Sequence, residues 1–272
     1  ELGADRWVDV ARYPIEGTTP TTFFLNAGPT ASGAPSINDG ALTERAPSDV
    51  TAADSVVYLG ATSPCDRQTE QWGAGGGALA FESGQLPPDP CSQDDRSLQV
   101  GRGALTYTTG PMRSDTVLAG PVDATVYATS TRPEVELVAT LEDVAPGGAS
   151  FPLTSGALLG SFRARNAKQT WTAPDGRPLL PYHPYTKASV VAVPTGKVTR
   201  YDIEVFPTVA RLAAGHRLRL TLTTSDTPHL LPTSTQAAGL AGGMYAVQRN
   251  AKASSFLEVP LVAASRFVSR GG

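Results

Sequence analysis

The sequence predicts an all-β sandwich, in which two layers of strands enclose one core, and three observations support this prediction. Apolar and polar residues alternate along many short stretches, as they do in strands that bury one face. The 272-residue chain holds 27 Gly and 23 Pro, and clusters of these turn residues separate the stretches. Helical patterns do not alternate with the strands, which argues against a parallel α/β sheet. Strands of this kind bury their apolar faces by packing one sheet against another.

The clearest strand patterns lie in residues 120–143 (GPVDATVYATSTRPEVELVATLED), on either side of a Pro-containing turn at 130–133. The expected inward-facing residues are Val122, Ala124, Val126 and Ala128 in the first strand, and Val135, Leu137, Ala139 and Leu141 in the second. The turn is too short for a helical crossover between parallel strands. We therefore expect these strands to be antiparallel neighbours in one sheet.

Further strands are expected at 23–25, 56–59, 105–108, 116–119, 158–165, 188–193, 200–205, 217–223 and 255–261. Residues 28–54 are small and polar, which predicts a long surface loop. Helix is expected only at 208–214, with a turn near 166–170. Because the regular part begins at residue 105, we divide the predicted domain into entry strands and long loops (1–104) and a sandwich core (105–272).

Charge and hydropathy limit the classes of function. The chain has 22 Lys and Arg against 25 Asp and Glu, a formal net charge of −3, so it has no general attraction for nucleic acid or for an anionic membrane. No apolar run reaches the roughly 18 to 20 residues that cross a bilayer. The sequence starts with Glu1 instead of Met, as expected of a mature secreted product or of a piece of a longer chain.

The two cysteines, Cys65 and Cys91, both lie in Pro/Gly-rich surroundings (SPCDRQ and PDPCSQ) that predict exposed loops. Structural thiols of a reduced cytosolic protein would more often lie inside apolar strands. A Cys65–Cys91 disulfide is therefore expected, with two unrelated free thiols as the alternative. Half of a metal site is disfavoured because no other Cys and only three His exist as ligands.

Several motifs resemble those of one family of multidomain enzymes. They are LTYTTGPMRSDTVLAGPVDATVYATS, VELVATLEDVAPGG, LTSGALLGSFRAR and TRYDIEVFPTVARLAAGHRLRLTLTTSDTPH, and the most specific piece is GHRLRL at 215–220. Together they look like the C-terminal domain of the Xaa-Pro dipeptidyl-peptidase and cocaine-esterase-like serine hydrolases. The resemblance covers most of the chain. It implies a jelly-roll sandwich of the galactose-binding type, appended to an α/β-hydrolase domain that this chain lacks.

No catalytic residue is expected in the chain itself. An α/β-hydrolase nucleophile needs Gly-x-Ser-x-Gly on a strand-to-helix elbow, and the nearest match, GASFP at 148–152, fails at the last glycine. Ser225, Asp226 and His229 lie close together in SDTPH, but triad members usually come from distant parts of a chain. A loop-capping or interface role is therefore expected for them. The GAGGG run at 73–77 precedes no helix and no Gly-Lys-Ser/Thr, which favours a flexible loop over a nucleotide site.

No metal or other cofactor is expected either. His216 follows a turn glycine and should begin a strand with its ring partly buried, and His183 is held on a loop by its Pro and Tyr neighbours. Neither has a partner at ligand spacing. Glu142 and Asp143 are expected to be solvated at a strand end and to cap a turn, with a structural Ca²⁺ site as the alternative.

The residues of most functional interest are aromatic side chains in loop-like stretches: Trp72, Trp171, Tyr182 and Tyr185. Together with His229 they are candidates for an interface that docks another domain; sugar stacking and ordinary packing are the alternatives. The favoured interpretation is a non-catalytic domain of a secreted or cell-envelope serine hydrolase, which packs on the α/β-hydrolase domain and helps to shape the substrate entrance. A free-standing carbohydrate-binding module comes second, and a small hydrolase with an unrecognised site comes third.

Overall fold

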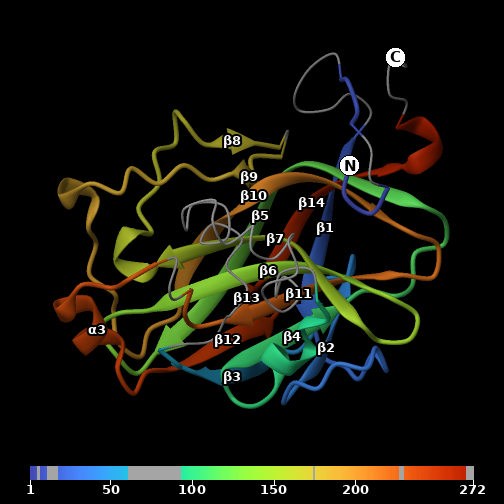
Figure 1. Cartoon of the computed structure of the whole chain (residues 1–272). Helices are drawn as coiled ribbons and strands as arrows, with labels where there is room; N and C mark the ends of the chain where they lie inside the picture. Colours follow the sequence, from blue (N-terminus) through green and yellow to red (C-terminus); the bar gives the residue numbers. More distant parts are fainter. Residues whose placement is uncertain (5–6, 11–17, 61–92, 174, 227–229, 268–272) are drawn as a thin grey trace, which may run out of the picture.

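The computed structural model describes residues 1–4, 7–10, 18–60, 93–173, 175–226 and 230–267, which form the predicted all-β sandwich (Figure 1). The main sheet contains β1 (Thr19–Asn26), β2 (Asp39–Thr43), β3 (Ala53–Val57), β4 (Ala104–Thr108), β5 (Thr116–Ser130), β6 (Glu136–Val144), β7 (Ser150–Leu159), β10 (Thr199–Leu212), β11 (Arg217–Thr223), β12 (Met244–Asn250), β13 (Ala253–Ser254) and β14 (Phe256–Ala263). A separate small sheet pairs β8 (Trp171–Thr172) with β9 (Pro178–Leu180). Helical structure in the described ranges comprises α3 (Ser234–Leu240) and 3₁₀ turns at Asp95–Gln99, Gly160–Phe162, Lys187–Ser189 and Ala264–Arg266.

The twelve strands of the main sheet form two layers that are joined through β1 and β2. One hydrogen-bonded path runs β13-β12-β5-β14-β1-β2-β4-β11-β6-β7, with β10 added to β5 and β3 to β12. β4, β11, β6 and β7 lie over β5, β10, β12 and β14, and one continuous core cluster takes buried residues from both sets of strands (Figure 1). The strands before residue 105 thus pair into the same sheet as those after it. The division of the domain between residues 104 and 105 stays a prediction. The assignment of the sandwich to the galactose-binding type also stays a prediction.

β5 is the central strand of its layer. It is 15 residues long, pairs with β10 along one edge and shares its other edge between β12 and β14. β6 pairs instead with β11 and β7. The expectation that these two strands are antiparallel neighbours is therefore wrong, because the intervening turn carries the chain from one layer to the other. Their expected inward-facing residues do all lie in the same core cluster, so the two apolar faces cover one another across the sandwich.

Two other local predictions are wrong because tertiary contacts decide the backbone. Residues 208–214 were expected to be helical, but β10 continues to Leu212 and pairs again with β5 after a bulge between Val205 and Thr208. Residues 188–193 form no strand. The Arg163 guanidinium donates hydrogen bonds to the carbonyl oxygens of Val191 and Ala192 at 2.9 and 2.8 Å, which satisfies that backbone without a strand partner.

The other element boundaries differ in smaller ways. The strand expected at 158–165 ends at Leu159, where a 3₁₀ turn begins, and the loop expected at 28–54 contains β2 and the start of β3. α3 is not among the expected elements, although a capping box between Thr233 and Gln236 marks its start. The strands expected at 23–25, 105–108, 217–223 and 255–261 are confirmed as β1, β4, β11 and β14.

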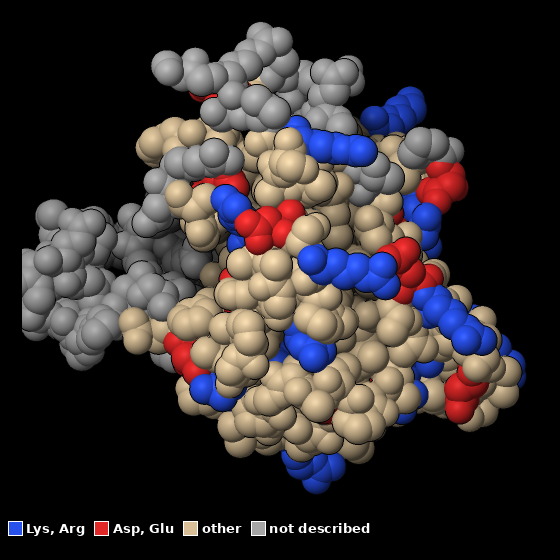
Figure 2. All heavy atoms as spheres, turned by 90° about the vertical axis from the view of Figure 1, so that its right-hand side faces the viewer, with Lys and Arg blue, Asp and Glu red and all other residues tan. Residues whose placement is uncertain are grey.

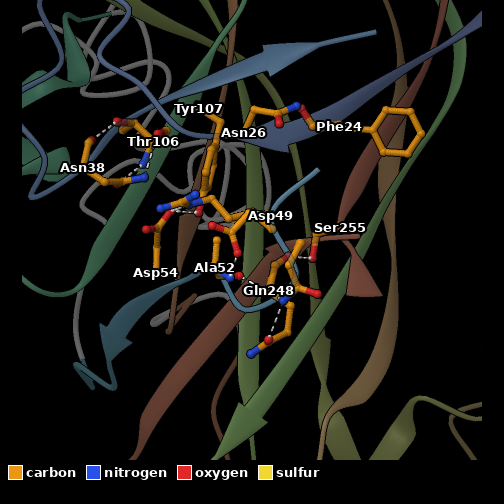
Figure 3. A network of polar contacts seen from close by, with 12 residues as sticks. Phe24, Asn26, Asn38, Asp49, Ala52, Asp54, Thr106, Tyr107, Gln248 and Ser255 are labelled. Carbon is orange, nitrogen blue, oxygen red and sulfur yellow. Dashed lines mark hydrogen bonds and ion pairs between the residues drawn. The ribbon is translucent and has the colours of Figure 1, made fainter. Parts of the chain in front are cut away.

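Buried polar groups hold the strand layers in place. The carboxylate of Asp54 on β3 accepts hydrogen bonds from the Tyr107 hydroxyl on β4 (2.8 Å) and from Arg249 Nε on β12 (2.9 Å) (Figure 3). Burial, followed by the charge of Asp54, raises the pKa of the fully enclosed Tyr107 well above its ordinary value. Close by, the Asn38 side chain binds both the backbone N–H and the carbonyl of Thr106, at 2.9 and 3.1 Å (Figure 3).

Arg219 on β11 is the largest fully buried side chain of the described residues. Its guanidinium donates hydrogen bonds to the Thr108 hydroxyl (3.0 Å), to Gln99 Oε1 (2.8 Å) and to the Ser32 hydroxyl (3.0 Å). A buried guanidinium is tolerated only when its donors are satisfied in this way. The arginine therefore fastens the loop before β2 and the 3₁₀ turn at Asp95–Gln99 to the strand layer.

Candidate functional site

A groove of about 460 Å³ opens beside β7 and β10, and we call it the β7/β10 groove. It is lined by Glu136, Gly156, Ala157, Leu159, Phe162, Tyr185, Glu204, Phe206, Leu230, Leu231, Pro232 and Gln236. Most of this lining is apolar. Phe206 and Leu231 are 52% and 75% exposed, which is unusual for side chains of this kind grouped around one hollow. The groove is therefore the first place to look for a ligand or a partner.

Two local features of the sequence shape this groove. The register of β10 shifts between Val205 and Thr208, and this bulge turns Phe206 outward, where its carbonyl accepts a hydrogen bond from the Thr154 hydroxyl at 2.8 Å. Gly156 allows β7 to approach β10 closely, since a Cβ at that position would lie 1.9 Å from the carbonyl oxygen of Glu204. The bulge and the glycine together shape the part of the groove that β7 and β10 line.

Glu204 and Tyr185 bring polar atoms to the apolar walls. Burial raises the pKa of Glu204, and the charge of the nearby His183 opposes that rise. Burial, followed by the charge of Glu204, raises the pKa of the Tyr185 hydroxyl to about 12. The Tyr185 ring packs against Phe162 and His183, with ring centroids 5.7 and 5.8 Å apart. The charge of Glu204 therefore affects the ionisation of the Tyr185 hydroxyl, and both residues line the groove.

Glu136 lines the groove and is almost fully buried. Its Oε1 accepts a hydrogen bond from the Asp226 backbone N–H at 3.0 Å, while its Oε2 has no hydrogen-bond partner among the described residues. Burial raises the pKa of Glu136 to about 7; the Asp226 amide opposes the rise, and the charges of Asp226 and Glu134 add to it. This carboxyl therefore changes its charge near neutral pH.

The interface candidates of the sequence analysis fall into two groups. Trp171, Tyr182 and Tyr185 are 43%, 41% and 52% exposed, all three on the segment that leads from β7 to β10. Of these, Tyr185 lines the groove. Trp72 and His229 lie outside the described residues, as do Cys65 and Cys91 and their expected disulfide. Whether these aromatic side chains dock another domain stays a prediction.

The two histidines in the described ranges have structural partners. His216 is partly buried at the start of β11, as expected, and its Nδ1 lies 2.8 Å from an Asp143 carboxylate oxygen. His183 is buried, with its Nε2 2.8 Å from the Asp202 carbonyl. Within the described ranges no three His, Cys, Asp or Glu side chains form a group that could hold a metal ion, and no helix is long and apolar enough to span a bilayer.

The expectation for Glu142 and Asp143 is wrong. The two residues are adjacent on β6, so their side chains point to opposite faces of the strand and do not share a site. Glu142 is buried, not solvated, and accepts a hydrogen bond from the Thr221 hydroxyl at 2.8 Å. Burial, followed by the charge of Asp95, raises its pKa well above the ordinary value.

Four groove residues, Glu136, Glu204, Phe206 and Leu231, were not singled out from the sequence. For Phe206 the sequence does contain a pattern that indicates an outward-facing position. Tyr201, Ile203 and Val205 alternate inward, and the next residue is again apolar and is followed by a proline, which is typical of a bulge on an edge strand. For Glu136 and Glu204 the alternation predicts only solvent-facing positions, and it gives no sign that loops from distant parts of the chain enclose them.

Known proteins match this chain both in sequence and in structure. Cocaine esterase of Rhodococcus sp. (strain MB1 Bresler) is 23% identical over 228 residues, which are 84% of this chain and 33% of that protein. An aminopeptidase from a marine sediment archaeon, Thaumarchaeota archaeon, superposes with a TM-score of 0.68 at 16% identity, covering 97% of this chain and 40% of that one. A CocE/NonD family hydrolase from Staphylococcus aureus gives a TM-score of 0.60 at 14% identity, over 94% of this chain and 39% of that one. These two structures support the fold alone.

The extent of the matches bears on the domain organisation. The chain spans about a third of the length of the curated relatives it matches. Residues 1–247 match the family described as the X-Pro dipeptidyl-peptidase C-terminal non-catalytic domain. The motifs on which the sequence resemblance was based, from LTYTTG to the strand that carries GHRLRL, lie within that match and form β4 to β11 of the sandwich. The chain therefore belongs to the family of X-Pro dipeptidyl-peptidase C-terminal non-catalytic domains.

Proposed function

We propose that this domain packs on an α/β-hydrolase domain of the same parent protein and helps to shape that enzyme's substrate entrance. The observation that carries the proposal is the row of exposed aromatic side chains, Trp171, Tyr182 and Tyr185, on the segment between β7 and β10. The core of the sandwich is complete without them, since none belongs to the buried core cluster. A loop surrounded by water gains nothing from such side chains, whereas an interface does.

The face that Figure 2 shows is less suited to docking. On the face that Figure 2 shows, Lys and Arg side chains are interspersed with Asp and Glu side chains, and no patch of a single sign stands out. Two of the ion pairs of the described residues, Arg96–Asp94 and Arg211–Asp115, join partly exposed side chains, and such pairs contribute little to association. An apolar interface remains the best-supported mode of docking.

The proposal extends to the parent enzyme. Its nucleophile, base and acid would all come from the α/β-hydrolase domain, and it would hydrolyse peptides or acyl esters by serine chemistry. We also propose that the parent is secreted or lies in the cell envelope, a setting that suits a Cys65–Cys91 disulfide.

The test compares Trp171→Ser and Tyr182→Ser in two settings, this chain alone and the full-length parent. Each aromatic side chain that is buried in an interface contributes roughly 1 to 3 kcal/mol. In the isolated chain both variants should leave the melting temperature almost unchanged, because these side chains are already exposed. In the parent they should lower the melting temperature or the activity. Phe151→Ser, an exposed aromatic at the far end of β7, is the matched control and should do neither.

Two results would contradict the proposal. One is a large loss of stability in the isolated chain without any further loss in the parent, which would make these aromatic residues part of the domain's own packing. The other is specific glycan binding by the isolated chain that Trp171→Ser abolishes. That result would favour the alternative, a carbohydrate-binding module.

A further inference from the structure

The charge and the walls of the β7/β10 groove fit one class of ligand. Its lining contains two carboxylates, Glu136 and Glu204, and no Lys, Arg or His. A volume of about 460 Å³ falls within the range of small-molecule sites, which are mostly apolar with a few polar anchors. We propose that the groove binds a small organic cation, an ammonium ion carried on an aromatic or aliphatic body. This inference concerns the chain by itself, in which Tyr185 is exposed at the groove.

Glu204 is the anchor for the ammonium group. Its side chain is only partly buried, so a ligand can reach it from the solvent. Its carboxylate forms no hydrogen bond or ion pair with any described residue; the charge of His183 lowers its pKa, and its own charge raises the pKa of Tyr185. A carboxylate that lines the groove together with Tyr185 and Phe206, and that has no ion pair among the described residues, gains most from a cation that the ligand supplies.

Tyr185 supplies the second contact. Its backbone φ is +49°, a left-handed conformation that is uncommon for a residue other than glycine, and such conformations are enriched at ligand sites. The ring packs on Phe162 and His183, yet 52% of the residue stays exposed at the groove. An ammonium ion beside Glu204 therefore also lies within reach of an aromatic ring, where a cation–π contact adds to the ion pair.

The body of the ligand rests on the apolar wall. The apolar lining includes Phe206, Leu231, Pro232, Ala157 and Leu159. The nearly buried Glu136 also lines the groove, and its Oε2, which has no hydrogen-bond partner among the described residues, adds negative charge there when the group is ionised. A neutral ligand of the same shape gains only the apolar contacts, and an anion is repelled. Preference for a cation over its neutral isostere is therefore the property that defines the site.

The experiment titrates this chain with phenethylammonium, 2-phenylethanol and 3-phenylpropanoate at pH 8, using amide NMR shifts to locate binding. Phenethylammonium should bind with a dissociation constant of about 1 mM, as expected of a fragment, and should shift the signals of Tyr185, Phe206 and Leu231. The neutral alcohol should bind about tenfold more weakly, the equivalent of one charge-assisted hydrogen bond at about 1.4 kcal/mol per tenfold. The anion should not bind.

Three variants separate the contributions of charge and wall. Glu204→Gln should reduce the affinity for the ammonium to that of the alcohol and leave the affinity for the alcohol unchanged. Leu231→Ser should weaken both ligands by the same factor. Glu44→Gln, the same change at an exposed carboxylate outside the groove, should have no effect.

Several outcomes would overturn the proposal. Equal affinities of the ammonium and the alcohol would make the groove an apolar hollow without cation selectivity. Shifts confined to other residues would place the site elsewhere. No binding of any probe up to about 10 mM would reject a small-molecule site, and the groove would then be a contact surface for a larger partner.

Discussion

Replacing Glu136 by Gln should change how the stability of the domain depends on pH. Burial raises the pKa of this carboxyl from its ordinary value of 4.5 to about 7. The folded protein therefore keeps the proton up to a higher pH than the unfolded chain does. As the pH rises from about 4.5 to about 7, the unfolded chain loses its proton first, and the free energy of unfolding falls.

The size of the effect follows from the two pKa values. Each unit of difference between the folded and unfolded pKa values corresponds to about 1.36 kcal/mol. The free energy of unfolding therefore falls by about 3 kcal/mol between pH 4.5 and pH 8. Gln cannot ionise, and its oxygen can still accept the hydrogen bond from the Asp226 amide. Between pH 5 and pH 8, the free energy of unfolding of Glu136→Gln should therefore rise by about 2 to 3 kcal/mol relative to that of the wild type.

Urea unfolding followed by tryptophan fluorescence at several pH values measures this gain. The quantity of interest is the difference in the free energy of unfolding between variant and wild type, followed as the pH changes. The contributions of titrating groups that the substitution does not affect cancel in this difference. Glu44→Gln, an exposed carboxylate, should run parallel to the wild type at every pH. A constant difference between Glu136→Gln and the wild type from pH 5 to pH 8 would refute the reasoning, and would mean that Glu136 is ionised throughout.

Two further substitutions probe the packing, and two labelling experiments probe the chemistry and the expected disulfide. Gly156→Ala should destabilise the domain by roughly 3 kcal/mol or more in denaturant unfolding, because the alanine Cβ would lie 1.9 Å from a backbone oxygen of β10. A variant as stable as the wild type would mean that β7 is free to move away from β10. Arg219→Ala should lower the free energy of unfolding by roughly 3 to 5 kcal/mol in the same assay, since it leaves buried acceptors without donors. A loss under 1 kcal/mol would show that water replaces the guanidinium. A fluorophosphonate should not label this chain; stoichiometric labelling that Ser225→Ala removes would reveal a catalytic serine. Alkylation with intact-mass analysis should find Cys65 and Cys91 blocked before reduction and reactive afterwards, and two reactive thiols in protein from an oxidising host would exclude the bridge.

Much of the fold could be predicted because the relevant signal is local. Alternation along 122–128 and 135–141 identifies which side chains are buried, and those side chains do form the shared core. Alternation carries no information about which strand lies alongside. The chain between β5 and β6 could close a hairpin or cross between layers, and only the distant partners β10, β11 and β14 decide the outcome. Helix propensity at 208–214 was overridden in the same way.

The groove was harder to predict from sequence than the core. Tyr185 could be singled out because an aromatic residue between loop residues is locally unusual. Glu136 and Glu204 look like ordinary solvent-facing strand positions, and their raised pKa values arise from enclosure by segments up to about ninety residues away, such as the one that contains Asp226. A charged residue at an outward strand position is informative only after the three-dimensional surroundings are known.

The arrangement of β5 also governs when the domain can fold during synthesis. Its first edge partner, β10, follows some seventy residues later, and the partners on its other edge, β12 and β14, come last in the sheet. A nascent chain that has left the ribosome as far as residue 240 therefore carries this long, largely buried strand with one edge unpaired. Pairings this distant in sequence form slowly, and open edges of apolar strands attract other chains. Truncation before β14 would leave an aggregation-prone polypeptide, because β5 would lack part of its second edge.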